Sequence, residues 1–197
     1  MSIERTPQSV QRAIEEGFAL TPPPDPRYLT DTYDDEGVGE YFGGRPWRGH
    51  NPYDLRYHSC ALSFFTAPAF RYYLPAFMLA MINSRCEADI IPDVLWRRFL
   101  RWNGKDHLLK ITLSELFPEP ERKAIAEFFR YESDRKVRDW DLAGFPWDAV
   151  ISVERPTRII LANLGCLMNP ETLKCRAIRK AMAERYQYPF EERLPAD

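Results

Sequence analysis

Three side chains in the segment HNPYDLRYH are of the types that hold metals or transfer protons: His50, Asp54 and His58. Imidazole and carboxylate groups are the usual acids, bases and zinc ligands of enzymes. The two histidines are eight residues apart with a proline between them, which matches no recognised ligand spacing. A small metal-dependent or hydrolytic enzyme that uses the 47–58 loop, with Trp47 beside these three residues, is therefore the alternative hypothesis.

Other catalytic and cofactor motifs do not occur in the sequence. It contains no GxSxG nucleophile motif, and the glycine-rich GVGEYFGG lacks the Lys-Ser/Thr pair of a phosphate-binding loop. The cysteines, Cys60, Cys86, Cys166 and Cys175, form no CxxC pair, so a zinc site of that kind is not indicated. We therefore expect a non-enzymatic protein with no catalytic residues, no metal and no cofactor.

A second group of residues, between positions 31 and 41, is typical of a binding surface. Carboxylates alternate here with tyrosines, a composition that is common in protein interfaces. A solvated loop is the simpler interpretation, but these carboxylates would also attract a basic partner and speed its association. The residues predicted to contact a protein partner are Asp31, Tyr33, Asp34, Asp35, Glu36, Glu40 and Tyr41.

The composition of the chain limits what that partner can be. The 197 residues are 45% hydrophobic and 28% charged, and the formal net charge of −2 gives no general attraction to nucleic acids or anionic membranes. In WRRFLRW, at residues 96–102, arginines and aromatic residues fall mostly on opposite sides of a helix, which predicts an ordinary amphipathic helix. The N-terminus has no apolar run of the secretory type, so we expect a cytoplasmic protein. The sequence does not define the oligomeric state.

The longest apolar segment, LSFFTAPAFRYYLPAFMLAMI, starts at Leu62 and is close to the length of a membrane span. Arg71 and two prolines interrupt it, and Thr66 is placed to cap a helix that begins at residue 67. The remaining apolar run is too short to cross a bilayer, so we expect a central, nearly all-apolar core helix and no membrane contact. We predict a partner for the Arg71 head group. The residues predicted to be buried are Phe70, Leu74, Phe77 and Met81.

The rest of the chain is organised around this helix. Apolar spacing predicts further helices at residues 7–19, 94–102 and 119–135, the second of them capped by Asp93. The proline-rich residues 21–34 predict an extended connector, and residues 147–197 a C-terminal helical extension. LSFF, before the core helix, is read as a short strand or an extended approach. The sequence therefore predicts a mainly α single domain over residues 1–197, with room for minor short strands.

RYHSCALSFFTAPAFRYYLPAFMLAMI resembles the signature segment of an uncharacterised bacterial family, whose members carry LSFFT-P-AFRYYLPAF-L. The upstream EGVGEYFGGRPWRGHNPYDLRYH and the downstream ERKAIAEFFRY are also similar to blocks of that family. The resemblance covers about residues 35–135 and is most specific at 64–77. The family supplies no established activity and no catalytic residues. The resemblance implies that some members are encoded beside secreted toxins, which makes an immunity protein the role that we expect for this protein-binding chain.

Overall fold

A computed structural model describes residues 5–30, 36–102, 109–142 and 156–165 of the chain. These residues are mainly helical, which confirms the predicted mainly α class. A single isolated bridge between Thr30 and Phe65 is the only β-structure in them. The helices are α1 (Pro7–Gly17), α2 (Val38–Phe42), α3 (Pro52–Tyr57), α4 (Ala61–Phe64), α5 (Ala67–Asn83), α6 (Arg85–Ala88), α7 (Ile91–Leu100), α8 (Leu113–Leu116) and α9 (Glu119–Leu142).

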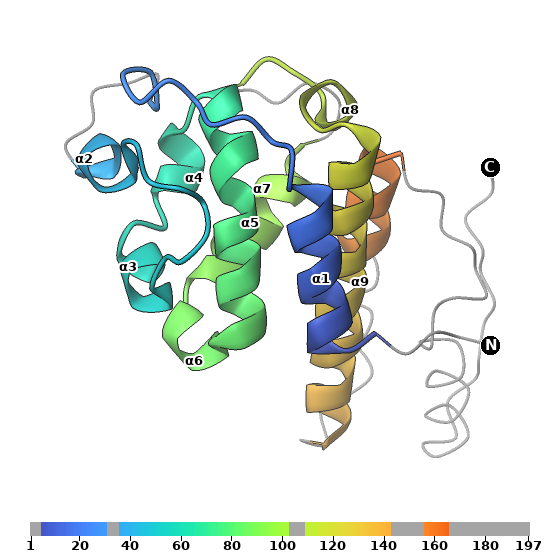
Figure 1. The fold of residues 1–197 in the computed structure, drawn as a ribbon. Coiled ribbons are helices and arrows are strands. Elements are labelled where there is room, and N and C mark those ends of the chain that lie inside the picture. The colour runs from blue at the N-terminus through green and yellow to red at the C-terminus, as the bar shows by residue number, and fades with distance from the viewer. Residues whose placement is uncertain (1–4, 31–35, 103–108, 143–155, 166–197) are drawn as a thin grey trace.

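Helix α5 lies at the centre, with α1 and α9 on one side and α2, α3 and α4 on the other (Figure 1). All four of the apolar residues predicted to be buried on α5, Phe70, Leu74, Phe77 and Met81, are inaccessible to solvent. None of the described helices combines the length and the apolar character that a membrane crossing needs. The core helix is thus surrounded by other helices of the same chain, as its apolar faces on all sides predict.

Thr66 precedes α5 with an extended backbone, at the capping position that the sequence predicts. Its hydroxyl does not cap the helix, however, and instead donates a hydrogen bond of 2.9 Å to the carbonyl oxygen of Tyr28. The Thr66 amide donates a second bond, of 2.8 Å, to the carbonyl of Leu29. The start of α5 therefore holds the end of the connector in place.

Arg71 has the partner that the sequence predicts. Its Nε and Nη2 atoms donate to the two carboxylate oxygens of Glu121 on α9 at 2.7–3.0 Å. The hydroxyl of Thr21 donates to the same carboxylate at 2.6 Å, and both Thr21 and Glu121 are buried. Charge-assisted bonds of this bidentate type are strong and directional. The cluster joins α5, α9 and the beginning of the connector.

Helices α1 and α9 pack in direct contact along their lengths (Figure 1). Gly17 lies against the first turns of α9, where an added Cβ would stand 2.8 Å from the Cβ of Ala124 and 3.0 Å from the carbonyl oxygen of Pro120. A side chain at position 17 would therefore overlap α9. Glycine permits this close approach at the end of α1.

Two glutamates on α9 have pKa values displaced in opposite directions. Glu132 is wholly buried, and this burial raises its pKa even though Arg135 donates a hydrogen bond of 2.6 Å to it. Burial acts in the same way on Glu127, but there bonds from Arg5 at 2.8 Å and Arg130 at 2.6 Å outweigh it and lower the pKa. The two carboxylates therefore provide opposite responses of stability to pH.

Several predicted boundaries differ from the structure. LSFF is not a strand, because all but its last residue belongs to α4; Leu62 is buried there, and the amide of Phe65 bonds to the carbonyl of Ala61. The two phenylalanines of LSFF favour a strand, but packing in the tertiary structure overrides this preference. Helix α7 begins at Ile91 and is not capped by Asp93, since the proline between them is suited to a first turn.

The segments predicted as the connector and the C-terminal extension lie partly outside the described residues. Of the connector, residues 21–30 are described, and of the extension, residues 156–165. Residues 156–163 are helical, in a part of the chain where the sequence leaves open short strands or a helix that enters at Thr157. Helix α9 continues to Leu142, seven residues beyond its predicted end at 135.

Candidate functional site

Two short helices position the candidate site. Gly37 precedes α2 with a φ of 68°, a left-handed conformation that glycine adopts without strain. Asn51 caps α3, because its side-chain oxygen accepts a hydrogen bond of 2.8 Å from the amide of Tyr53, and Pro52 occupies the first turn. With its start fixed in this way, α3 buries Leu55 and turns both of its tyrosines towards solvent.

The structure brings together three residues that the sequence assigned to two different sites. The ring of Tyr41, from the predicted partner-binding segment, stacks on His58 with ring centres 4.4 Å apart and an interplanar angle of 23°. The Tyr41 hydroxyl lies 3.1 Å from Nδ1 of His50. The guanidinium of Arg45 lies over the Tyr41 ring at 4.6 Å from its centre. Tyr41 is therefore half-buried in an aromatic cluster that includes both histidines of the 47–58 loop.

Two groups of the cluster, Tyr41 and His50, are kept in their neutral forms by burial. Burial lowers the pKa of His50 below its ordinary value of 6.5. Burial, and to a smaller extent the charge of Asp54, raises the pKa of Tyr41 above 10.0. A neutral imidazole that accepts the phenol proton at Nδ1 carries its own proton on the buried Nε2. The Tyr41–His50 pair is suited to fixing the positions of the two rings.

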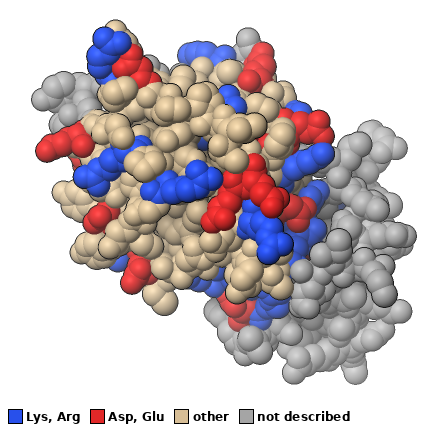
Figure 2. Space-filling model, viewed as in Figure 1, with Lys and Arg blue, Asp and Glu red and all other residues tan. Residues whose placement is uncertain are grey.

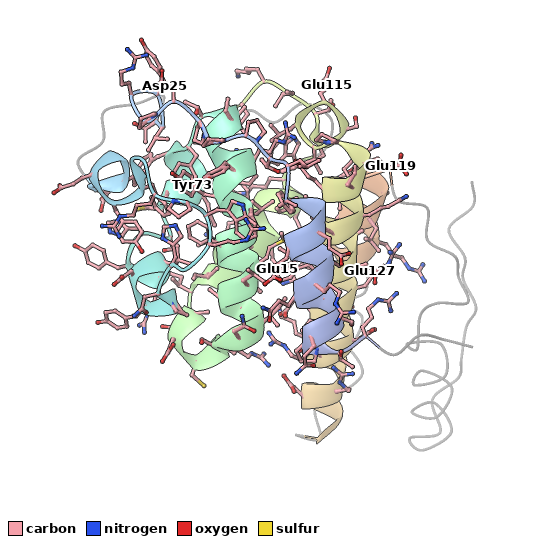
Figure 3. All side chains as sticks on the ribbon, viewed as in Figure 1. Glu15, Asp25, Tyr73, Glu115, Glu119 and Glu127 are labelled. Carbon is pink, nitrogen blue, oxygen red and sulfur yellow. The ribbon has the colours of Figure 1, made fainter. Side chains whose placement is uncertain are left out.

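Helix α5 supports the cluster from beneath. Tyr73 points from α5 towards α2, and its hydroxyl donates to the carbonyl oxygens of Phe42 at 2.6 Å and Arg45 at 3.0 Å (Figure 3). Burial raises the pKa of Tyr73 to about 12, so this donor keeps its proton over the physiological range. The Phe42 ring packs against Tyr73, with centres 4.8 Å apart. The α2 segment is thus bound to the core, and only its outer side is available to a partner.

The remaining residues of the alternative loop have separate environments. Trp47 is buried, with the guanidinium of Arg48 at 4.0 Å from its ring centre, whereas Asp54 is exposed. Within the described ranges, no group of three or more His, Cys, Asp or Glu side chains is placed to hold a metal ion. The metal-dependent or hydrolytic alternative stays a prediction from the sequence.

An exposed surface lies beside the aromatic cluster, and its most prominent residues were missed by the sequence reasoning. Tyr53 and Tyr57 are 63% and 77% exposed, and a spacing of four residues places them on one face of α3. The Tyr57 ring meets His58 edge-on, with centres 5.0 Å apart. The NPYDLRY pattern contains the signal, since Asn-Pro starts a helix and the two tyrosines follow at helical spacing.

Carboxylates complete this surface. We name it the α2–α3 surface and define it by its exposed residues Glu36, Glu40, Tyr53, Asp54 and Tyr57. The other predicted partner-binding residues, Asp31, Tyr33, Asp34 and Asp35, lie outside the described residues. On the face drawn in Figure 2, acidic and basic side chains are interspersed and leave wide uncharged areas between them.

Comparisons with known proteins identify no relative: no family model matches the sequence, and neither a curated protein nor a solved structure is significantly similar to it. The fold and the site define a mainly α protein with an aromatic Tyr–His cluster beside an exposed tyrosine–carboxylate surface.

Proposed function

We propose that this chain is a non-enzymatic, cytoplasmic protein that binds another protein through the α2–α3 surface. The observation that carries the proposal is the exposed pair Tyr53 and Tyr57 on α3. Tyrosine is enriched at interface hot spots, because its ring buries a large area at a small cost in side-chain entropy. The α3 helix is held by its cap and by the aromatic cluster behind it, so the two rings are presented on a fixed support.

The charge of this region favours a basic partner. Residues 31–58 contain six carboxylates and three arginines, a net charge of −3, whereas the whole chain carries only −2. One of these arginines, Arg56, is already paired with Asp89 at 2.7 Å. A local excess of negative charge steers a basic protein towards the surface and raises the association rate at low salt.

The specific role that we propose is immunity against a secreted bacterial toxin. It rests on the resemblance of residues 35–135 to the uncharacterised bacterial family, and on the fit between an acidic, tyrosine-bearing surface and a basic toxin site. An immunity protein acts by occupying its target, so it requires a rigid complementary surface and no catalytic group of its own.

The binding proposal is tested with the tyrosines. Tagged wild-type protein is used to recover partners from a lysate of the cells that encode it, in parallel with the variant Tyr53→Ala/Tyr57→Ala. Ile159→Ala is the control, since this large hydrophobic side chain is also exposed but lies outside both the α2–α3 surface and the connector. We expect a partner that the wild type and the control retain and the double variant loses. Equal recovery by all three proteins would contradict the proposal.

The electrostatic part is tested by kinetics with the recovered partner. Glu36→Lys/Glu40→Lys should slow association at low salt and weaken its salt dependence, because steering depends on the summed field. Glu16→Lys/Glu119→Lys is the control with the same change of charge, at two exposed carboxylates on α1 and α9, which lie on the opposite side of α5 (Figure 1). If both reversals change the association rate equally, the effect reflects net charge alone.

The immunity role has a cellular test. The secreted protein encoded nearest to this chain is expressed inside cells with and without it, and growth is followed. Protection by the wild type, lost with Tyr53→Ala/Tyr57→Ala, is expected. Growth arrest that the wild type does not relieve, or a neighbouring protein that is harmless, would remove the immunity role and leave the binding proposal to its own experiment.

A further inference from the structure

The connector between α1 and α2 has a backbone that its sequence largely dictates. Residues 21–26 read TPPPDP, so each proline fixes its own φ and also restricts the residue before it to extended conformations. Together these constraints favour the left-handed polyproline II helix, with three residues per turn. Described residues 21–25 contain no helix or strand, in agreement with this expectation. A turn then ends this geometry, because the amide of Tyr28 donates a hydrogen bond of 3.0 Å to the carbonyl of Asp25.

Both ends of the connector are anchored to the core. At its start, the buried Thr21 bonds to Glu121 at 2.6 Å. At its end, Leu29 is buried and its carbonyl accepts the bond from the amide of Thr66. The segment therefore crosses the surface between two fixed points (Figure 1). Because the connector is already fixed at both ends, a partner that binds it pays little conformational entropy to order it.

Between its anchors the connector is exposed and rich in unused binding groups. Pro23 and Pro26, one polyproline turn apart, are both exposed, and the flanking Leu20 and Tyr28 are 95% and 66% exposed. Figure 3 shows Asp25 at the outer edge of the molecule, pointing away from the helices. No hydrogen bond from a described residue ends on the carbonyls of residues 22–24, so they remain available as acceptors.

We propose that residues 21–26 form a second docking element, which binds a protein domain with an aromatic-lined groove of the kind that accepts polyproline II segments. Such grooves hold alternate prolines between aromatic rings, a mode that uses the preformed geometry of the segment. Tryptophan N–H and tyrosine O–H groups of the groove would donate to the connector carbonyls. The proposal is independent of the α2–α3 surface and of the function assigned to it.

Charge has a minor part in this second contact. The guanidinium of Arg27 is paired with Asp25 at 2.6 Å within the connector itself, so the two charges largely cancel. Apolar rings and carbonyl acceptors remain as the recognised groups. Binding through the connector should therefore depend weakly on salt, in contrast to the salt-dependent association proposed for the α2–α3 surface.

The experiment uses the full-length chain as bait and a nine-residue peptide, LTPPPDPRY (residues 20–28), as competitor. A photo-crosslinking residue at position 22 captures whatever contacts the connector in a lysate of the cells that encode the chain. We expect a captured domain with an aromatic groove, released by the peptide but not by the same peptide with alanine at all of its prolines. Affinity for the purified domain is then measured in low and high salt.

Variants show whether the captured domain binds the connector or another part of the surface. Pro23→Ala/Pro26→Ala should weaken binding at least about tenfold, or about 1.4 kcal/mol. Pro118→Ala, an exposed proline outside the connector, should leave binding unchanged, and so should Tyr53→Ala/Tyr57→Ala. Thermal melting of each variant shows that its fold is retained. Absence of a captured protein, capture that the peptide does not reverse, or equal binding by Pro23→Ala/Pro26→Ala would each overturn the proposal.

Discussion

Removing the guanidinium of Arg71 should destabilise the fold more than any change to an ion pair on the surface. The Glu121 side chain is only 4% exposed and Arg71 26% exposed, so Arg71→Ala would leave a buried carboxylate with Thr21 as its remaining partner. Breaking a buried pair in this way costs about 3–5 kcal/mol. Because water reaches part of Arg71 and Thr21 continues to donate, we expect a value near the lower limit, about 3 kcal/mol.

The same geometry predicts a different result when the whole cluster is replaced. Thr21→Val removes one hydrogen bond to a charged group and should cost about 1.5–3 kcal/mol. The triple variant Thr21→Val/Arg71→Met/Glu121→Leu has no buried charge left without a partner, and it should lie within about 1 kcal/mol of the wild type or be more stable. The cluster is thus expected to specify how α5, α9 and the connector meet, at little net gain in stability.

Urea unfolding followed by tryptophan fluorescence measures these differences, provided that the slope of the transition is unchanged. A double-mutant cycle of Arg71→Ala and Thr21→Val isolates their coupling through Glu121. Arg27→Ala is the matched control, because its pair with Asp25 is exposed, and its midpoint should not move. A cost below about 1 kcal/mol for Arg71→Ala, or strictly additive effects in the cycle, would show that the carboxylate is better solvated than its burial indicates.

Three further predictions concern the core and α9. Phe77→Ala, at a wholly buried position of α5, should cost about 3–5 kcal/mol in urea unfolding. Gly17→Ala should cost about 1–3 kcal/mol in the same assay, since the new methyl group would overlap Ala124. Because the pKa of Glu132 is raised, its native form holds a proton more tightly than the unfolded chain, and its contribution to stability falls as pH rises from 4.5 through the folded pKa. The pKa of Glu127 is lowered, so its contribution to stability is lost as pH falls below 4.5 through the folded pKa. Glu132→Gln and Glu127→Gln should therefore flatten opposite sides of the curve of melting temperature against pH.

The helices that the sequence predicts well are those with both an apolar period and a local start signal. Thr6 caps α1 through a reciprocal pair of bonds with Ser9, and the helix begins at the proline that follows. The short helices α4 and α6 have four residues each and no side-chain cap bond. A single turn is too short to display a period and is stabilised by its packing, so tertiary contacts decide it. Residues 62–65 show no helical period for the same reason, and their sequence therefore predicts a short strand or an extended approach.

The partner of Arg71 illustrates what a sequence can and cannot specify. An arginine within an apolar helix predicts that some acceptor must meet it, because an unpaired buried charge is costly. It does not predict which acceptor, and the structure supplies Glu121, fifty residues away. That Arg71 needs an acceptor follows from local chemistry, whereas the identity of the acceptor follows from how α5 and α9 pack.

The same difference between local chemistry and packing applies to the candidate site. Helical geometry explains why some of its predicted residues lie on the exposed surface and others in the aromatic cluster. A helix from Val38 to Phe42, at roughly 3.6 residues per turn, places these two residues inward and Glu40 on the opposite side. Tyr41 then falls between the two sides, where it is half-buried and can reach His50. The composition of residues 31–41 groups Tyr41 with the neighbouring carboxylates. Its position on α2, however, places Tyr41 in the aromatic cluster. The exposed aromatic surface lies instead on α3, whose Tyr57 meets edge-on the same histidine, His58, that Tyr41 stacks on.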